Sequence, residues 1–274
     1  MATGSVEIVS AGPQASESFA RFADRWVWAF MAALFIAAVL IGFIPDSIAQ
    51  IHAIQAHRRP PFPWFLHIHG AVMGSWMLVL LSQTVLMATG RRHWHACLGL
   101  ASLALAPLVL LLMIVMTWTG PMGGILAAPP QRVPLPVFSI GLGGALFLQG
   151  RSIALFTIFY AWAFLTRRTQ PETHKRMMLL ATWATIDAGL ARFLGATEPG
   201  LALREALHRV ELSEVWLLGM LLPVLLYDIV RRGRIHYAWG VGAALFLPFF
   251  ASFHLLTAAP PWWLHILADI TGRH

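Results

Sequence analysis

Charged side chains are scarce in this sequence, and the shortage excludes a large soluble domain. Only 11% of the 274 residues are Asp, Glu, Lys or Arg, whereas a soluble domain carries about 25%. Charges keep a protein surface in water, so this chain has too few to cover a globule of its size. Hydrophobic residues make up 58% of the chain, and this composition favours lipid surroundings.

Cysteine is also nearly absent, since Cys97 is the only one. A single cysteine excludes an intramolecular disulfide and a cysteine-based metal cluster. The sequence also lacks a P-loop, a GxSxG nucleophile motif, an HExxH zinc motif and the histidine boxes of membrane di-iron enzymes. The net charge of +7 comes from 18 Arg and one Lys against 12 acidic residues. These basic residues lie in short connections without interleaved aromatics, which favours a membrane face and argues against nucleic acid as a partner.

Long uncharged runs are the most informative feature that is present. A spanning helix needs about 20 apolar residues to cross a hydrocarbon core about 30 Å thick. Four runs without Asp, Glu, Lys or Arg reach that length: 26–45, 60–90, 96–131 and 237–264. The sequence therefore predicts an all-α, polytopic transmembrane bundle in contact with the lipid bilayer.

The runs and their flanking residues predict about seven spans in one transmembrane domain, residues 23–274, after a disordered cytoplasmic tail, residues 1–22. The predicted spans are 26–45, 63–89, 95–118, 146–166, 175–196, 212–230 and 237–258. Arg151 interrupts the fourth apolar run, so residues 133–150 are either a re-entrant segment or part of that span. A short C-terminal segment with Trp262 and Trp263 is expected at the membrane interface, where Trp is favoured.

The distribution of basic residues predicts the orientation. With seven spans, eleven basic residues lie on the side of the N-terminus and six lie on the other. Cytoplasmic loops carry the excess of Lys and Arg. We therefore expect a multi-pass protein of the bacterial inner membrane with a cytoplasmic N-terminus.

Twelve histidines stand out in so apolar a chain, and most fall near predicted span ends. Imidazole is a common axial ligand of haem b, and facing helices of a bundle can supply one ring each. We expect an outer ligand level from His69 and His254, with both as ligands of the haem iron. An inner level would come from His95 with His174 or His236. The alternative without a cofactor is that these rings lie at the headgroup level of the membrane or bond to the backbone of a neighbouring helix.

Helical spacing supports this interpretation in part. His236 and His254 are 18 residues apart, which is five turns of an α-helix. On the second span, His69 shares a face with Trp76 and Gln83, whereas His67 points the opposite way.

Two charges are predicted within the hydrocarbon of the fifth span. Arg192 is a candidate to bind a haem propionate or an anionic substrate, and its structural alternative is an ion pair or a snorkelling side chain. Asp187 lies on another side of the helix, so its partner is expected on a different span. Asp228 is expected to pair with Arg231 or Arg232 at the end of the sixth span.

Three motifs together resemble a known family. They are His67-Ile68-His69-Gly70, Gly90-Arg91-Arg92-His93-Trp94-His95 followed by Gly99, and His174-Lys175-Arg176-Met177-Met178. Over residues 63–196 the chain resembles bacterial multi-span proteins of the DUF2306 kind, a group similar in turn to the cytochrome b561 architecture. The resemblance implies a four-helix core with His69, His95 and His174 as haem ligands. One departure is that the fourth span has no histidine, with Gln149 as its nearest polar substitute.

The leading hypothesis is a haem b-binding protein, an oxidoreductase-type electron carrier that passes electrons across the membrane or to and from quinone or a redox protein. A small-molecule transporter is the first alternative, with Asp187, Arg192 and Gln83 along a polar path. The absence of inverted repeats and paired broken spans argues against it. A non-catalytic assembly or scaffold subunit of a larger membrane complex is the second alternative.

Overall fold

A computed structural model describes residues 13–122, 142–206, 212–254 and 261–271, and these residues are almost entirely helical. The α-helices, in chain order, are α1 (Pro13–Gln55), α2 (Trp64–Ala88), α3 (Arg92–Thr117), α6 (Leu142–Thr166), α7 (Pro171–Trp183), α8 (Asp187–Ala196), α9 (Glu198–Ala206), α10 (Leu212–Gly219), α11 (Leu222–Arg232), α12 (Tyr237–His254) and α13 (Pro261–Thr271). A short π-helical turn, η1 (Trp118–Met122), follows α3.

Five helical segments are long and apolar enough to cross a membrane: Glu17–Gln55, Trp64–Ala88, Arg92–Gly120, Gly144–Thr166 and Pro171–Gly195. Large apolar side chains cover the outside of the bundle, for example Phe30, Leu78 and Leu111, which are each more than half exposed. A water-soluble monomer rarely leaves so much contiguous apolar surface uncovered. The chain therefore has the architecture of a multi-pass helical membrane protein.

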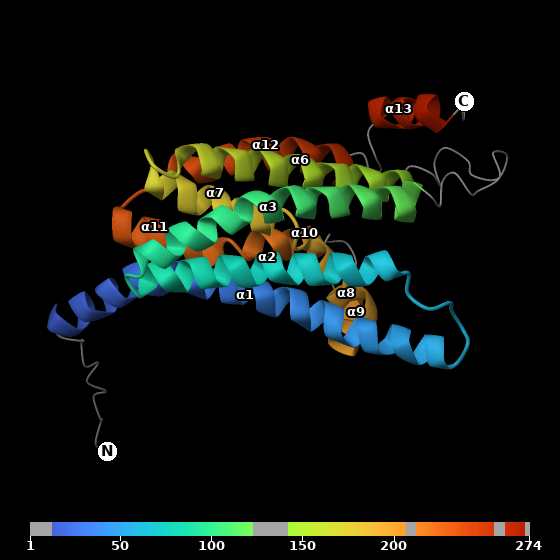
Figure 1. Cartoon of the computed structure of the whole chain (residues 1–274), viewed down its shortest axis with the longest axis horizontal. Helices are drawn as coiled ribbons and strands as arrows, with labels where there is room; N and C mark the ends of the chain where they lie inside the picture. The colour runs from blue at the N-terminus through green and yellow to red at the C-terminus, as the bar shows by residue number, and fades with distance from the viewer. Residues whose placement is uncertain (1–12, 123–141, 207–211, 255–260, 272–274) are drawn as a thin grey trace, which may run out of the picture.

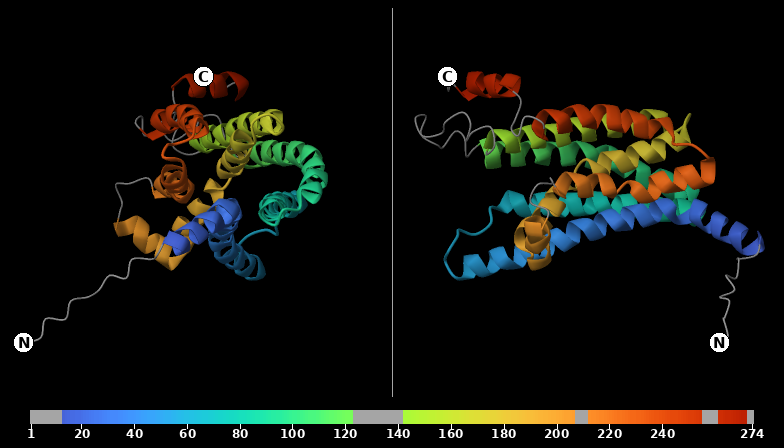
Figure 2. Two further views of the ribbon diagram at one scale, coloured as in Figure 1. Left: turned by 90° about the vertical axis from the view of Figure 1, so that its left-hand side faces the viewer. Right: turned by 180° about the vertical axis from the view of Figure 1, so that it is seen from behind.

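The helices run side by side along a common direction, with α7 near the centre (Figures 1 and 2). Helix α7 packs most extensively on α6 and also contacts α1 and α12, while α3 packs on both α2 and α6. The turns α2–α3, α6–α7 and α11–α12 all lie at one end (Figure 1). We call it the basic end, because its connections carry Arg91, Arg92, Arg167, Arg168, Arg231, Arg232 and Arg234.

The first and fourth predicted segments need adjustment. Helix α1 begins at Pro13, so the predicted tail is too long; residues 1–12 lie outside the described part of the chain. Helix α6 is regular from Leu142, so residues 142–150 belong to the fourth span, and the remainder of the possible re-entrant segment lies outside the described residues. Arg151 does not interrupt this helix, because its side chain is buried against an acidic partner on α8.

Two of the predicted spans each contain an interruption that the sequence did not predict. The fifth divides into α7 and α8 at residues 184–186, and the sixth divides into α10 and α11 at residues 220–221. At the second break the N–H of Leu221 donates to Leu218, which leaves the Leu217 carbonyl without its usual helical donor. The Trp183 indole N–H donates to that carbonyl at 2.6 Å. Non-helical backbone persists inside a membrane protein where such partners satisfy it.

A close helix crossing brings α8 against α1. A Cβ added at Gly42 would lie 1.8 Å from the Gly189 carbonyl oxygen, so only glycine allows this approach. The crossing places Arg192 of α8 beside Asp46 of α1, with 3.2 Å between Nε and Oδ2.

Candidate functional site

One face of α2 carries a row of polar side chains, His69, Trp76 and Gln83, which we call the polar column. Successive members are seven residues apart, so each lies about 10 Å further along the helix and on nearly the same side. Trp76 is buried, and His69 and Gln83 are half-buried. The column therefore defines an outer level at His69, a middle level at Trp76 and an inner level at Gln83, near the basic end.

At the middle level, the buried Trp76 side chain has its hydrogen bond satisfied inside the protein. The Trp76 indole N–H donates to Thr182 Oγ1 of α7 at 3.0 Å, and the Thr182 hydroxyl donates to Met178 O. The indole packs edge-on against Phe156 and Tyr160 of α6, with ring centroids 5.1 and 5.7 Å away. This contact joins α2, α6 and α7.

The inner level brings together two of the predicted ligand residues. His95 Nδ1 lies 3.3 Å from Gln83 O, and His174 Nδ1 lies 2.8 Å from Ala163 O. A carbonyl oxygen can only accept, so each Nδ1 donates its proton, and in the neutral form of each ring Nε2 then carries the lone pair. The two rings are within electrostatic range of each other and of Arg167.

The inner level also contains an unsatisfied amide. Gln83 Oε1 is buried and has no hydrogen-bond partner among the described residues. Its Nε2 lies close to Gly99 of α3, where an added Cβ would be 3.4 Å away. A buried polar atom without a partner is uncommon and often marks a place where a ligand or water belongs.

The outer level contains His69 and, from α8, Arg192. His69 Nδ1 is buried without a partner in the described part of the chain, and the ring is within electrostatic range of Arg192. Arg192 also donates to Ala188 O at 3.0 Å and lies over the Phe43 ring. Its ion pair with Asp46 matches the structural alternative for this residue, and its proximity to His69 leaves the ligand-binding hypothesis open.

His254 and His236 belong to other elements than the helices that carry His69, His95 and His174. His254 is the last residue of α12, which packs on α6 and α7, and α12 and α2 lie on opposite sides of α7 (Figures 1 and 2). His236 directly precedes α12 and caps it, since the Ala238 N–H donates to His236 Nδ1 at 3.2 Å; its five-turn alignment with His254 stays a prediction. Partial burial, followed by the nearby Arg176 charge, lowers the pKa of His236.

His236 borders a second polar group, the ionic cluster of Glu172, Arg176, Asp228, Arg232 and Trp239. Arg176 and Asp228 are completely buried. Arg176 Nε donates to Asp228 Oδ2 at 2.9 Å, and its Nη1 donates to Glu172 at 2.8 Å. Trp239 Nε1 donates to the same Asp228 oxygen at 2.7 Å. The predicted ion pairing of Asp228 is confirmed with Arg232, at 3.6 Å, and its main partner is Arg176, which the sequence did not indicate.

A third polar contact lies at the break between α7 and α8. Asp187 Oδ2 is 3.3 Å from Arg151 Nη2 of α6, and Arg151 is almost completely buried. The expectation that Asp187 pairs with a different span is confirmed. Its partner, Arg151, is the one charge inside the fourth predicted span, although the sequence did not indicate this pairing.

Sequence reasoning did not assign Thr182, Ser102 or Tyr160 to this region. Tyr160 OH donates to Ser102 O at 3.0 Å and ties α6 to α3. Hydroxyl residues are common in membrane helices, so no pattern distinguishes them before the packing is known. Among the described residues, no three His, Cys, Asp or Glu side chains gather in a group that could hold a metal ion.

The fold and the buried polar levels define a multi-pass membrane protein with polar side chains inside its helical bundle. Comparison of the chain with models of protein families, with curated proteins and with solved structures gives no match.

Proposed function

We propose that this chain binds haem b inside the membrane and transfers electrons, with His95 and His174 as axial ligands at the inner level. The observation that carries the proposal is that the two imidazoles have the same hydrogen-bonding arrangement. Both donate Nδ1–H toward a backbone carbonyl, and both keep Nε2 as a free donor atom for a metal. Histidine ligands in proteins are held in this way, because the second hydrogen bond fixes the tautomer and the ring orientation.

The donor set fits haem b, since two neutral imidazoles from different helices are a common axial pair. When bound, the haem supplies one-electron chemistry. The chain's own residues orient the rings through Gln83 O and Ala163 O, and Arg167 offers a positive charge near His174 for a propionate carboxylate. His69 and Arg192 offer a similar imidazole–guanidinium combination at the outer level, where His254 stays the predicted second ligand.

Quinone or a redox protein is the proposed electron partner. We also propose the bacterial inner membrane as the location, with the basic end in the cytoplasm, following the excess of Arg and Lys on that side. A reporter that is active only outside the cytoplasm, fused after residue 235, should therefore stay inactive.

The test is the visible spectrum of detergent-purified protein, oxidised in air and reduced with dithionite. We expect a Soret band that sharpens and shifts on reduction. His95→Ala and His174→Ala should each remove most of the inner-level absorbance. His93→Ala is the matched control, since His93 is exposed two residues from His95 and has contacts with its near neighbours Trp94 and Cys97. A colourless wild-type protein, or a band that survives both ligand substitutions, would contradict the proposal.

Transport is the second candidate function, and the interrupted helices favour it. Transporters place polar sites at discontinuous membrane helices, and here α7–α8 and α10–α11 are both interrupted and touch through Trp183 and Leu217. The buried Arg151–Asp187 pair lies at the first break. The sequence-based objection that broken spans are missing is therefore removed. Substrate uptake into proteoliposomes that persists in His95→Ala and His174→Ala and is lost in Asp187→Asn would favour transport over electron transfer.

A further inference from the structure

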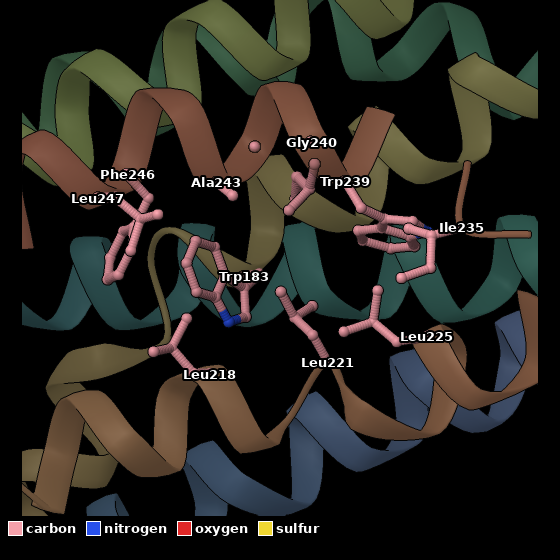
Figure 3. Close-up of a pocket in the computed structure, with 12 residues that line it drawn as sticks. Trp183, Leu218, Leu221, Leu225, Ile235, Trp239, Gly240, Ala243, Phe246 and Leu247 are labelled. Carbon is pink, nitrogen blue, oxygen red and sulfur yellow. The ribbon is translucent and has the colours of Figure 1, made fainter. Parts of the chain in front are cut away.

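A cavity of about 380 Å³ lies between α7, α10, α11 and α12, away from both histidine levels. Leu218, Leu221 and Leu225 line one side, Phe246 lies on the other, and Trp183 lies between them (Figure 3). We call it the α12 cavity. Its volume is at the lower end of the range typical for small-molecule sites in proteins.

The lining of the α12 cavity is almost wholly apolar. Its two indole N–H groups are both engaged elsewhere: Trp183 donates to Leu217 O, and Trp239 donates to Asp228 Oδ2. A quinone head group or another polar ligand would lose its hydrogen bonds with water and find no side-chain donor in exchange, which is unfavourable. The chemistry therefore fits a hydrocarbon chain.

Small residues on α12 create the space. A Cβ added at Gly240 would meet no atom within 4 Å, and Ala243 lies one turn further along the same wall (Figure 3). A larger side chain at Gly240 can therefore occupy the cavity without pushing backbone aside.

The cavity reaches the basic end at Ile235, next to an arginine without an acidic partner. Arg231 pairs with Asp24, and Arg232 pairs with Glu172 and Asp228. Arg234 is exposed, and no ion pair joins it to an acidic side chain among the described residues. Arg234 immediately precedes Ile235, which lines the cavity, so the backbone of an exposed basic residue adjoins this end of an apolar cavity.

We propose that the α12 cavity holds one acyl chain of an anionic phospholipid whose phosphate is bound by Arg234. The Arg234 charge selects the anionic head group, and the apolar lining accepts the hydrocarbon chain. Arginine is well suited to phosphate, because its planar guanidinium can donate two parallel hydrogen bonds. This proposal is independent of the proposed haem.

The test measures the thermal unfolding midpoint of the full chain in detergent with added phosphatidylglycerol or phosphatidylcholine carrying the same acyl chains. Saturating phosphatidylglycerol should raise the midpoint by about 5 °C, because a ligand that binds only the folded state stabilises it. Phosphatidylcholine should raise it by less than half as much.

Two kinds of variant separate the parts of the site. Gly240→Leu should abolish the response to both lipids, and Ala243→Phe, which fills the cavity from the same wall, is the second filling variant. Gly74→Leu is the matched control, since an added Cβ at this exposed α2 position also meets nothing within 4 Å. Arg234→Gln should retain the response to phosphatidylcholine and lose the preference for phosphatidylglycerol.

Several outcomes would overturn the proposal. If both filling variants kept the full response to phosphatidylglycerol, the lipid would not bind in the α12 cavity. An equal response to glycerol phosphate would show a head-group site without a chain. A larger shift with a short-chain quinone than with phosphatidylglycerol would identify a different ligand class.

Discussion

The ionic cluster at the basic end and the polar column of α2 are both buried and polar, yet they differ in how well their atoms are satisfied. In the cluster, Arg176 and Asp228 bind each other, and Glu172 and Trp239 complete their hydrogen bonds. In the column, His69 Nδ1 and Gln83 Oε1 lack partners in the described residues. A saturated buried network holds helices together, whereas an unsaturated one is where a ligand belongs.

The largest expected effect is the loss of the cluster's central acid. Asp228→Leu leaves the buried Arg176 charge with Glu172 alone, and removing one member of a buried ion pair costs about 3–5 kcal/mol of stability. Chemical denaturation in detergent measures it. The double variant Arg176→Met with Asp228→Leu should recover part of the lost stability, since it also removes the buried guanidinium charge that has lost its Asp228 partner. A change below about 1 kcal/mol in the single variant would show that the cluster is not a structural element.

A smaller effect is expected around the polar column, where the satisfied hydrogen bond at the middle level and the unsatisfied amide at the inner level should respond differently. Thr182→Val leaves the buried Trp76 N–H without its acceptor, which costs about 1–3 kcal/mol. Gln83→Leu removes an acceptor that has no partner, so the ligand-free protein should keep its stability or gain up to about 1 kcal/mol. The same denaturation experiment compares them. Equal destabilisation by both substitutions would contradict the distinction between the middle and inner levels.

The smallest effect is expected at the edge of the basic end. Asp24 pairs with Arg231 at 2.7 Å, but both side chains are more than a third exposed. Such pairs contribute little to stability, because water screens them. Asp24→Asn should therefore shift the denaturation midpoint only slightly, and less at high salt. A loss of stability as large as that of Asp228→Leu would show that solvent exposure does not determine how much each ion pair contributes.

The helical membrane class could be predicted from sequence because it depends on composition and run length, which are local. The partner of Asp187 could be expected on another span but not named, since the contact with Arg151 joins residues 36 positions apart. Likewise, the sequence could not say whether His95 lies near His174 or near His236. The answer depends on how α3, α6 and α7 pack together, which brings His95 within electrostatic range of His174.

The sequence carries a signal for one of the two span interruptions and none for the other. Pro223 lies in the first turn of α11 and cannot donate a backbone hydrogen bond, so it was a usable signal for the second break. No proline lies at residues 184–186. That break depends on tertiary contacts, including the Asp187–Arg151 pair, so hydropathy alone predicts an unbroken helix there.

The most direct test of the electron-transfer account is the amount of haem b extracted from wild-type protein that was expressed with sufficient iron and purified in mild detergent. The proposed pair of histidine ligands predicts about one haem or more for each chain. A purified, folded protein that carries almost none, and takes up none when haem is added, would contradict the account.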